Sequence, residues 1–249
     1  MEGTVRAIVL KRTDQGESDR RLTLFSLERG KFDVVAKGAR KAAGRLSALT
    51  EPLIVARFSM AEGKRNRFLT QAIPESAYRN LRSDYLRLTV ALGTAELFAA
   101  ILPYEQPDPE AFALLEATIA GIDDATEPLA PAIWGQMHQL ANGGFLPELS
   151  VCVVSGQATS VVDPWFSPSA GGLILNSLGV ADAYVLPTEV LFGLRRILEI
   201  NLPPARLKHA ELTQVLLAPW WRRVAETRLP AFDSLVEALK QDLNASLAK

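Results

Sequence analysis

The sequence predicts an α+β protein of more than one domain, with a small β-barrel at the N-terminus and an all-helical domain after it. Three observations support this fold class. Strand-like stretches fill roughly the first 75 residues. From Ser76 onward apolar residues recur at three- and four-residue steps, and proline and glycine crowd residues 147–180. We expect domains at 1–78 and 79–249, with 147–180 as an irregular or β-rich insertion in the second.

The barrel prediction depends on five short segments that are rich in β-branched and aromatic residues. Arg29-Gly30 supplies a turn between the second and third segments, and Pro52 places the fourth at a sheet edge or at a strand start. Five short antiparallel strands suit a closed barrel such as an OB-fold. The expected strands are 3–11, 21–27, 31–37, 49–60 and 66–73.

The helical prediction depends on amphipathic periodicity. One helix is expected from Ser76 to Pro103, and Asp108 with Pro109 has the pattern of an N-cap followed by a first helical residue. Short links between helices of this length indicate a packed bundle. The further expected helices are 109–121, 128–142, 188–201, 209–228 and 231–247.

Charge is unevenly distributed along the 249 residues. Residues 1–90 hold 18 Lys/Arg against 10 Asp/Glu, a net of +8, and the remainder holds 9 against 18, a net of −9. A basic module on an acidic protein is typical of polyanion binding, although a solvated, uneven surface is the plain alternative. No apolar run is long enough for a signal peptide or a membrane span, and Cys152 is the single cysteine. We expect a soluble, cytoplasmic protein without membrane contact.

Basic residues concentrate in the predicted barrel. A glycine-containing loop after the third strand carries four cations, which could follow a phosphate backbone. A second group lies at the turn before the fifth strand, beside Phe68, and the ordinary alternative for both groups is a solvated turn. The candidate DNA-binding residues are, first, Lys37, Arg40, Lys41 and Arg45, and then Arg20, Arg21, Lys64, Arg65 and Arg67.

No catalytic arrangement is evident. Glu17 and Asp19 have no third acid or histidine in a metal or acid–base spacing, and His138, His209 and Cys152 lack a nucleophile context. Phosphate-binding glycine motifs are missing as well. We therefore expect a binding protein with no catalytic residue, no metal and no cofactor.

A series of motifs in this order resembles the RecO family of recombination mediators, from the start of the chain to about residue 172. Each motif is weak alone, and the series is more specific. The motifs are Gly16-Glu17-Ser18-Asp19-Arg20, Leu22-Thr23-Leu24-Phe25, Glu28-Arg29-Gly30-Lys31, Val35-Ala36-Lys37-Gly38-Ala39-Arg40, Leu69-Thr70-Gln71-Ala72 and Gly144-Phe145-Leu146-Pro147-Glu148-Leu149 before Cys152.

The resemblance implies an OB-fold, a helical domain and a zinc-ribbon-like insertion in a nucleoid-associated DNA repair protein. It also implies binding of single- and double-stranded DNA, strand annealing, and cooperation with RecR in loading RecA onto DNA coated by single-strand-binding protein, whose acidic tail is an expected partner. Many relatives carry two C-x-x-C pairs, where this chain has Cys152, Ser155, Leu175 and Leu178. We therefore expect a degenerate ribbon with an apolar cluster and no zinc.

Three other interpretations stay open at this point. The barrel could serve an adaptor whose ligand is a protein, or an RNA-binding OB-fold protein, or an enzyme with an unrecognised site. Steep loss of DNA affinity with salt argues against the adaptor. Comparison of DNA with RNA, and turnover of labelled nucleic acid, test the other two.

Overall fold

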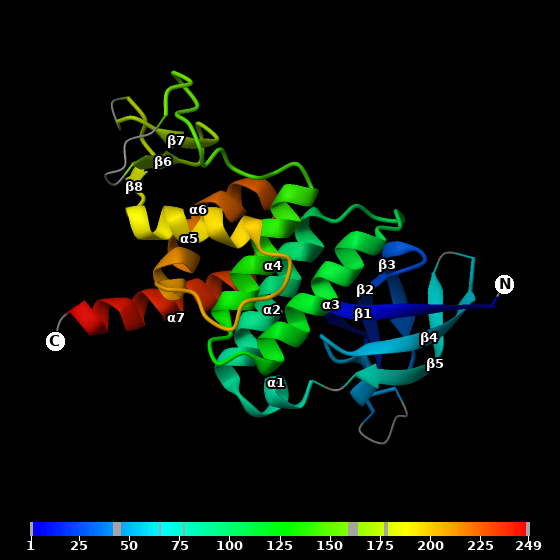
Figure 1. The fold of residues 1–249 in the computed structure, drawn as a ribbon. Helices are drawn as coiled ribbons and strands as arrows, with labels where there is room; N and C mark the ends of the chain where they lie inside the picture. Colours follow the sequence, from blue (N-terminus) through cyan, green and yellow to red (C-terminus); the bar gives the residue numbers. More distant parts are fainter. Residues whose placement is uncertain are drawn as a thin grey trace.

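The computed structural model describes residues 2–41, 46–64, 66–76, 78–158, 164–176 and 179–247. Figure 1 shows a β-barrel at one end, a helical body in the centre and a small β-containing insertion that projects from the far side of the body. The N-terminus lies on the barrel, and the C-terminus lies at the opposite end of the molecule. Within the described part of the chain, no helix is both long enough and apolar enough to cross a bilayer.

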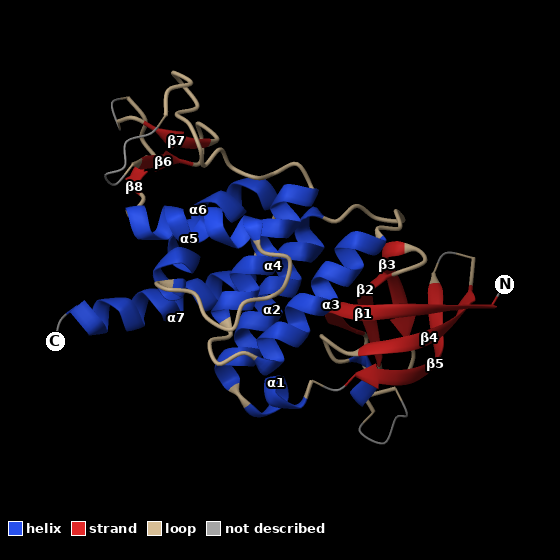
Figure 2. Ribbon diagram, in the orientation of Figure 1, coloured by secondary structure: helices blue, strands red, loops and turns tan. Residues whose placement is uncertain are grey.

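The barrel is closed by five strands in the order β1-β2-β3-β5-β4, with β4 returning to β1 (Figure 2). All neighbours are antiparallel except β3 and β5, which pair in parallel where Val35 faces Phe68. This five-stranded arrangement confirms the predicted OB-type barrel. The strands are β1 (Glu2–Gln15), β2 (Asp19–Ser26), β3 (Gly30–Ala36), β4 (Val55–Glu62) and β5 (Arg67–Ser76).

The fourth expected strand begins later than its sequence indicates. Residues 49–60 read as one strand, but β4 starts at Val55 and is preceded by the short 3-10 helix η1 (Ala48–Thr50). Leu53 adopts a left-handed backbone, with φ of 68°, and its side chain is buried. The segment therefore folds back to bury Leu53, a tertiary contact that overrides the local strand preference.

Seven helices follow the barrel in the described chain. They confirm the predicted helical domain, and most boundaries lie within a few residues of the periodicity. The helices are α1 (Arg79–Ser83), α2 (Tyr85–Ile101), α3 (Pro109–Asp124), α4 (Leu129–Asn142), α5 (Thr188–Glu199), α6 (Ala210–Ala225) and α7 (Pro230–Leu247).

The first expected helix is interrupted, which corrects the continuous helix predicted from Ser76. Strand β5 extends to Ser76, and α1 ends before Asp84. Asp84 has an extended backbone and its side chain accepts a hydrogen bond from the backbone N–H of Arg87. Because an aspartate in this position satisfies an unpaired donor at a helix start, a new helix begins there although the apolar spacing continues.

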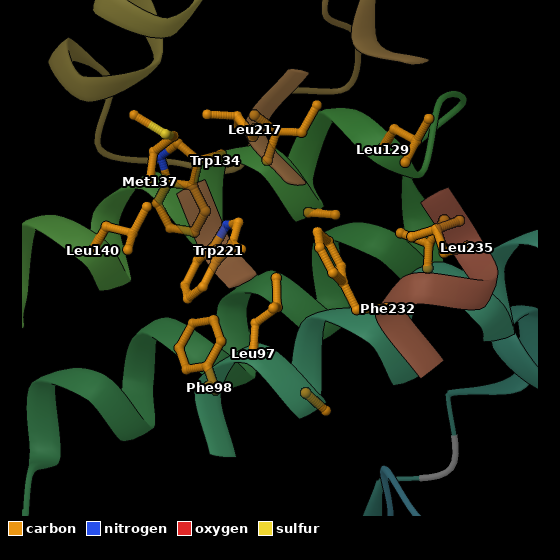
Figure 3. Close-up of a cluster of buried hydrophobic side chains, with 14 of the residues drawn as sticks. Leu97, Phe98, Leu129, Trp134, Met137, Leu140, Leu217, Trp221, Phe232 and Leu235 are labelled. Atoms are coloured by element: carbon orange, nitrogen blue, oxygen red, sulfur yellow. The ribbon is translucent and has the colours of Figure 1, made fainter. Parts of the chain in front are cut away.

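The helical core gathers around α2, α4, α6 and α7. Figure 3 shows Trp221 with Trp134 and Phe98 at the centre of this cluster and Phe232 of α7 beside it. Both tryptophans of the Trp220–Trp221 pair are buried, although adjacent residues of a helix point about 100° apart. The Trp220 indole Nε1 donates to the carbonyl of Phe145 at 3.0 Å, so the pair stabilises the body and the base of the insertion.

The insertion holds a three-stranded sheet in the order β7-β6-β8, with its last strand beyond the predicted end at 180. Cys152 is buried there, and the Ser155 hydroxyl and neighbouring backbone N–H groups, including that of Leu175, lower the pKa of its thiol. Leu175 is exposed, and Leu178 lies outside the described residues. The strands are β6 (Trp165–Ser167), β7 (Gly172–Ile174) and β8 (Tyr184–Val185).

The side chains of the insertion do not provide the ligands that a structural zinc ion requires. Such a site needs about four Cys or His ligands, and the insertion offers one thiol. His138 lies in α4 and its Nε2 contacts the carbonyl oxygens of Ile197 and Ile200. Across the described ranges, no three His, Cys, Asp or Glu side chains are grouped so that they could hold a metal.

Candidate nucleic-acid interface

The basic loop, residues 37–45, follows β3 and is described as far as Lys41. Its backbone is held against the β1–β2 turn. The Asp19 carboxylate accepts the N–H of Gly38 at 2.9 Å, and the carbonyl of Ser18 accepts the N–H of Arg40 at 2.9 Å. Ala39 is fully buried in the barrel core. The backbone at residues 38–40 is therefore fixed to the β1–β2 turn, between the cationic side chains of Lys37 and Lys41.

Asp19 is the central residue of this anchor. Its hydrogen bond from the Gly38 backbone, and then that from the Ser18 hydroxyl, hold the pKa of the carboxyl below its usual value. Gly38 has a φ of +67°, the left-handed region that glycine adopts at little cost. Asp19 thus stays charged near neutral pH and fixes the turn that displays the neighbouring cations.

Three of the candidate cations are exposed on the described part of the loop. The Lys37 ammonium lies 4.4 Å from the centroid of the Phe68 ring, a cation–π contact between the basic loop and β5. Arg40 pairs with Asp14 at 3.3 Å. The backbone N–H of Lys41 donates to the carbonyl of Gly38 at 3.1 Å, but its ammonium group makes no hydrogen bond or ion pair to any described residue. Arg45, the fourth candidate, lies outside the described residues.

Arg20 has an internal position instead. Its side chain is 11% exposed, and its Nη1 donates to the Thr50 hydroxyl at 2.8 Å and to the Glu51 carboxylate at 3.1 Å. A guanidinium held in this way fastens η1 to the barrel, and because the side chain is largely buried, little of it is accessible to a phosphate. We therefore give Arg20 a structural role beside the basic loop.

Arg21, Lys64 and Arg67 line a groove between β3, the β4–β5 turn and the segment after α2. Arg21 pairs with Asp33 at 2.8 Å, and Arg67 pairs with Glu105 at 2.5 Å. Lys64 is exposed, and Arg65 lies outside the described residues. The three described cations of this groove thus face three acids, Asp33, Glu62 and Glu105, so the groove has little net charge.

Two features of this interface were not predicted from the sequence. The sequence did not indicate that Asp19 anchors the basic loop. The sequence also did not predict that Glu105, 38 positions from Arg67, contacts the barrel. Asp19 and Gly38 lie 19 residues apart, and Arg67 and Glu105 lie 38 apart, so neither contact had a local signal in the sequence.

The fold and this site define a class of protein, an OB-type barrel with an exposed cationic loop joined to a helical body. The family model for the N-terminal part of recombination protein O matches residues 1–78, and the model for its C-terminal part matches residues 82–218. Together these models match most of the chain. The chain belongs to the recombination protein O (RecO) family.

Curated relatives that carry the name DNA repair protein RecO agree with this assignment. The Myxococcus xanthus protein is 31% identical over 220 residues, 85% of this chain and 89% of the relative. The Roseiflexus sp. protein is 29% identical over 96% of this chain and 87% of its own length. The Heliobacterium modesticaldum protein is 35% identical over 69% of this chain, and that match spans 63% of the relative. The chain is thus similar to DNA repair proteins over both of its parts.

Proposed function

We propose that this protein is a recombination mediator of DNA repair that binds single- and double-stranded DNA and anneals complementary strands. The observation that carries the proposal is the anchored basic loop, which displays Lys37, Arg40 and Lys41 on an OB-type barrel. Long cationic side chains neutralise phosphates without contacting base edges, so two bound strands keep their pairing edges free. Annealing of this kind breaks and forms no covalent bond.

The proposal extends to the partners expected of a RecO protein. The protein acts with RecR to load RecA onto DNA coated by single-strand-binding protein, whose acidic tail it recognises. Support for these partners is the membership of the RecO family and the relatives' role in DNA repair. An annealing reaction between complementary oligonucleotides, run with the coating protein intact or lacking its acidic tail, measures that contact. Equal rates with both forms would argue against tail recognition.

The DNA-binding proposal is tested by the salt dependence of affinity. The double variant Lys37→Ala/Lys41→Ala should bind oligonucleotides of unrelated sequence more weakly. Its slope of log affinity against log salt should fall by roughly 0.7 per lost phosphate contact for a single strand. Fluorescence anisotropy at several salt concentrations gives this slope.

A matched control removes two cations from the acidic helical body. Arg223 and Lys240 are exposed on α6 and α7. The double variant Arg223→Ala/Lys240→Ala should retain the affinity and the slope of the unmodified protein. A loop variant that binds as tightly as this control would remove the basic loop from the proposal, and preference for RNA over DNA of the same sequence would favour a role in RNA binding.

A further inference from the structure

A cleft lies at the junction of the barrel and the helical body, with a volume of about 360 Å³. It is bounded by β1, β2 and the start of β3 on the barrel side, and by α2 and the α6–α7 link on the other. We call it the junction cleft. Its charged or aromatic lining residues are Lys11, Arg12, Lys31, Glu96, Tyr104 and Arg228.

The junction cleft is positively charged, in contrast to the balanced groove on the barrel. Four cations line it against one acid, Glu96, whose carboxylate accepts the backbone N–H of Phe232 at 2.9 Å. The side chains of Lys11 and Arg228 are exposed, and neither side chain forms a hydrogen bond or an ion pair with any part of the chain that is described. The cleft therefore offers two uncommitted cations, one from β1 and one from the link before α7.

Tyr104 forms an aromatic platform at the edge of the cleft. The buried ammonium of Lys31 lies 4.3 Å from the centroid of the ring, and it also donates to the carbonyl of Ala99 at 2.6 Å. A backbone hydrogen bond from Glu105 to the carbonyl of Lys31 holds the segment against β3. The Tyr104 side chain nevertheless remains 53% exposed, so part of the ring is open to a ligand.

The junction cleft is continuous with the basic loop through a chain of ion pairs. Arg40 contacts Asp14 at 3.3 Å, Asp14 contacts Arg20 at 3.9 Å, and Glu51 then joins Arg20 to Arg12. In the β1–β2 ladder the Asp14–Arg20 pair lies three residues from the pair formed by Lys11 and Thr23. Three residues of strand correspond to roughly 10 Å, a span of a few nucleotides.

We propose that the junction cleft is a second contact site for a single nucleic-acid strand that leaves the basic loop, in which a base stacks on Tyr104 while Lys11 and Arg228 contact phosphates. The charge of the cleft selects a polyanion, and the open ring selects one with planar bases. The inference rests on the proposed DNA binding. It adds the helical body to the binding surface and names a base-stacking residue.

The test separates stacking from charge by comparing an oligothymidylate with an oligonucleotide of the same length that carries abasic sugars. The unmodified protein should bind the base-containing strand more tightly. Tyr104→Ala should lose this preference, with affinity for oligothymidylate falling roughly tenfold. Tyr104→Phe should keep it. Tyr104→Leu, which preserves apolar bulk, should lose it as Tyr104→Ala does, and it replaces that variant if the alanine protein does not fold.

Tyr85 supplies the matched control, since it is 86% exposed at the start of α2. Tyr85→Ala should bind both strands as the unmodified protein does. Lys11→Ala/Arg228→Ala should weaken binding to both strands equally and lower the salt slope, because it removes charge and leaves the ring.

Four outcomes decide the proposal. Loss of the base preference in Tyr104→Ala, with Tyr104→Phe unchanged, supports it. A preference that survives in Tyr104→Ala and Tyr104→Leu overturns it, and so does an unmodified protein that binds both strands equally. An unmodified protein that binds neither strand at low salt overturns the proposed DNA binding itself, and the inference with it.

Discussion

Arg6 of β1 and Glu116 of α3 form an ion pair that fastens the barrel to the helical body. The Arg6 Nη1 donates to a Glu116 oxygen at 3.1 Å, while its Nε donates to Glu75 at 2.7 Å. The same guanidinium lies 5.2 Å from the centroid of the Phe112 ring. The hydrogen bond to Glu116 is the main cause of the raised pKa of Arg6. One side chain thus connects two strands and a helix.

Arg6→Ala should lower the free energy of unfolding by about 1.5 kcal/mol or more. The change removes charge-assisted hydrogen bonds and the packing of the side chain on Phe112. Urea unfolding measures the loss. Arg57→Ala is the control, because Arg57 also pairs with Glu75 but is 65% exposed, and it should cost less than about 0.5 kcal/mol. Equal costs would show that Arg6 does not stabilise the contact between barrel and body.

Gly30 is required at the start of β3 because the backbone of the segment after α2 lies directly against it. Its φ is +71°, and a Cβ there would overlap the backbone of Gln106. Gly30→Ala should therefore destabilise the fold by at least about 3 kcal/mol, since the strained backbone and the overlap act together.

Gly16 is the matched control for this substitution. Its φ is +61°, but a Cβ at this position would have no neighbouring atom within 4 Å among the described residues. Gly16→Ala should cost only about 1 kcal/mol, the conformational part alone. Thermal unfolding of both variants separates the two contributions, and similar melting temperatures would contradict the close approach of residue 106.

A reciprocal amide pair joins α4 to α6 in the helical core. Gln136 donates to Gln214 at 2.9 Å, and Gln214 donates back at 3.0 Å, with both side chains fully buried. Gln136→Leu should cost about 1–3 kcal/mol, because it leaves the amide of Gln214 without its partner.

The double variant Gln136→Leu/Gln214→Leu should be more stable than the sum of the two single changes predicts. Replacing both partners by apolar groups of similar size leaves neither amide buried without the other. Denaturant unfolding of the four proteins gives the coupling free energy. Strict additivity would mean that the two amides do not interact.

Cys152 should ionise near neutral pH. The hydrogen bond from the Ser155 hydroxyl, followed by those from backbone N–H groups, lowers the pKa of the thiol from 9.0 to about 7. Because the chain has one cysteine, thiolate absorbance in the far ultraviolet, relative to Cys152→Ser, should rise with a midpoint near pH 7. Ser155→Ala should move this midpoint upward, and a midpoint near 9 in the unmodified protein would contradict the lowered pKa.

The lowered pKa of Cys152 also determines the direction in which the stability of the protein changes with pH. A pKa that is lower in the folded state means that the folded protein releases the proton more readily. The contribution of Cys152 is therefore fully present above pH 9 and is lost as pH falls toward 7. The stability difference between the unmodified protein and Cys152→Ser should grow as pH rises over this interval.

Much of the architecture could be predicted because its signals are local. Strand composition located the five barrel strands, and the Asp108–Pro109 pattern located the start of α3, where Asp108 accepts the N–H of Ala111. The predicted element boundaries were wrong where tertiary contacts or capping determine them. Burial of Leu53 delays β4, and capping by Asp84 divides the expected first helix.

Within the candidate site, the sequence was sufficient to identify exposed cations only in the basic loop. Lys37 and Lys41 are exposed, and their loop is adjacent to the β1–β2 turn. Arg20 looked equivalent to them in sequence but is held by Thr50 and Glu51. Nothing in the sequence indicated that Lys11 and Arg228 line one cleft, because they lie more than two hundred residues apart and form no cluster in the sequence.

The amino-acid sequence by itself determined the order of barrel and helices, the charge of each part and the loop where cations follow β3, because strand propensity, helical periodicity and charge depend on neighbouring residues. Only the tertiary structure decided which cations remain free. Ion pairs such as Arg6–Glu116 and Arg67–Glu105 join residues that are distant along the chain. Whether a guanidinium is neutralised depends on distances of a few ångströms, which are set when the barrel packs against the helical body.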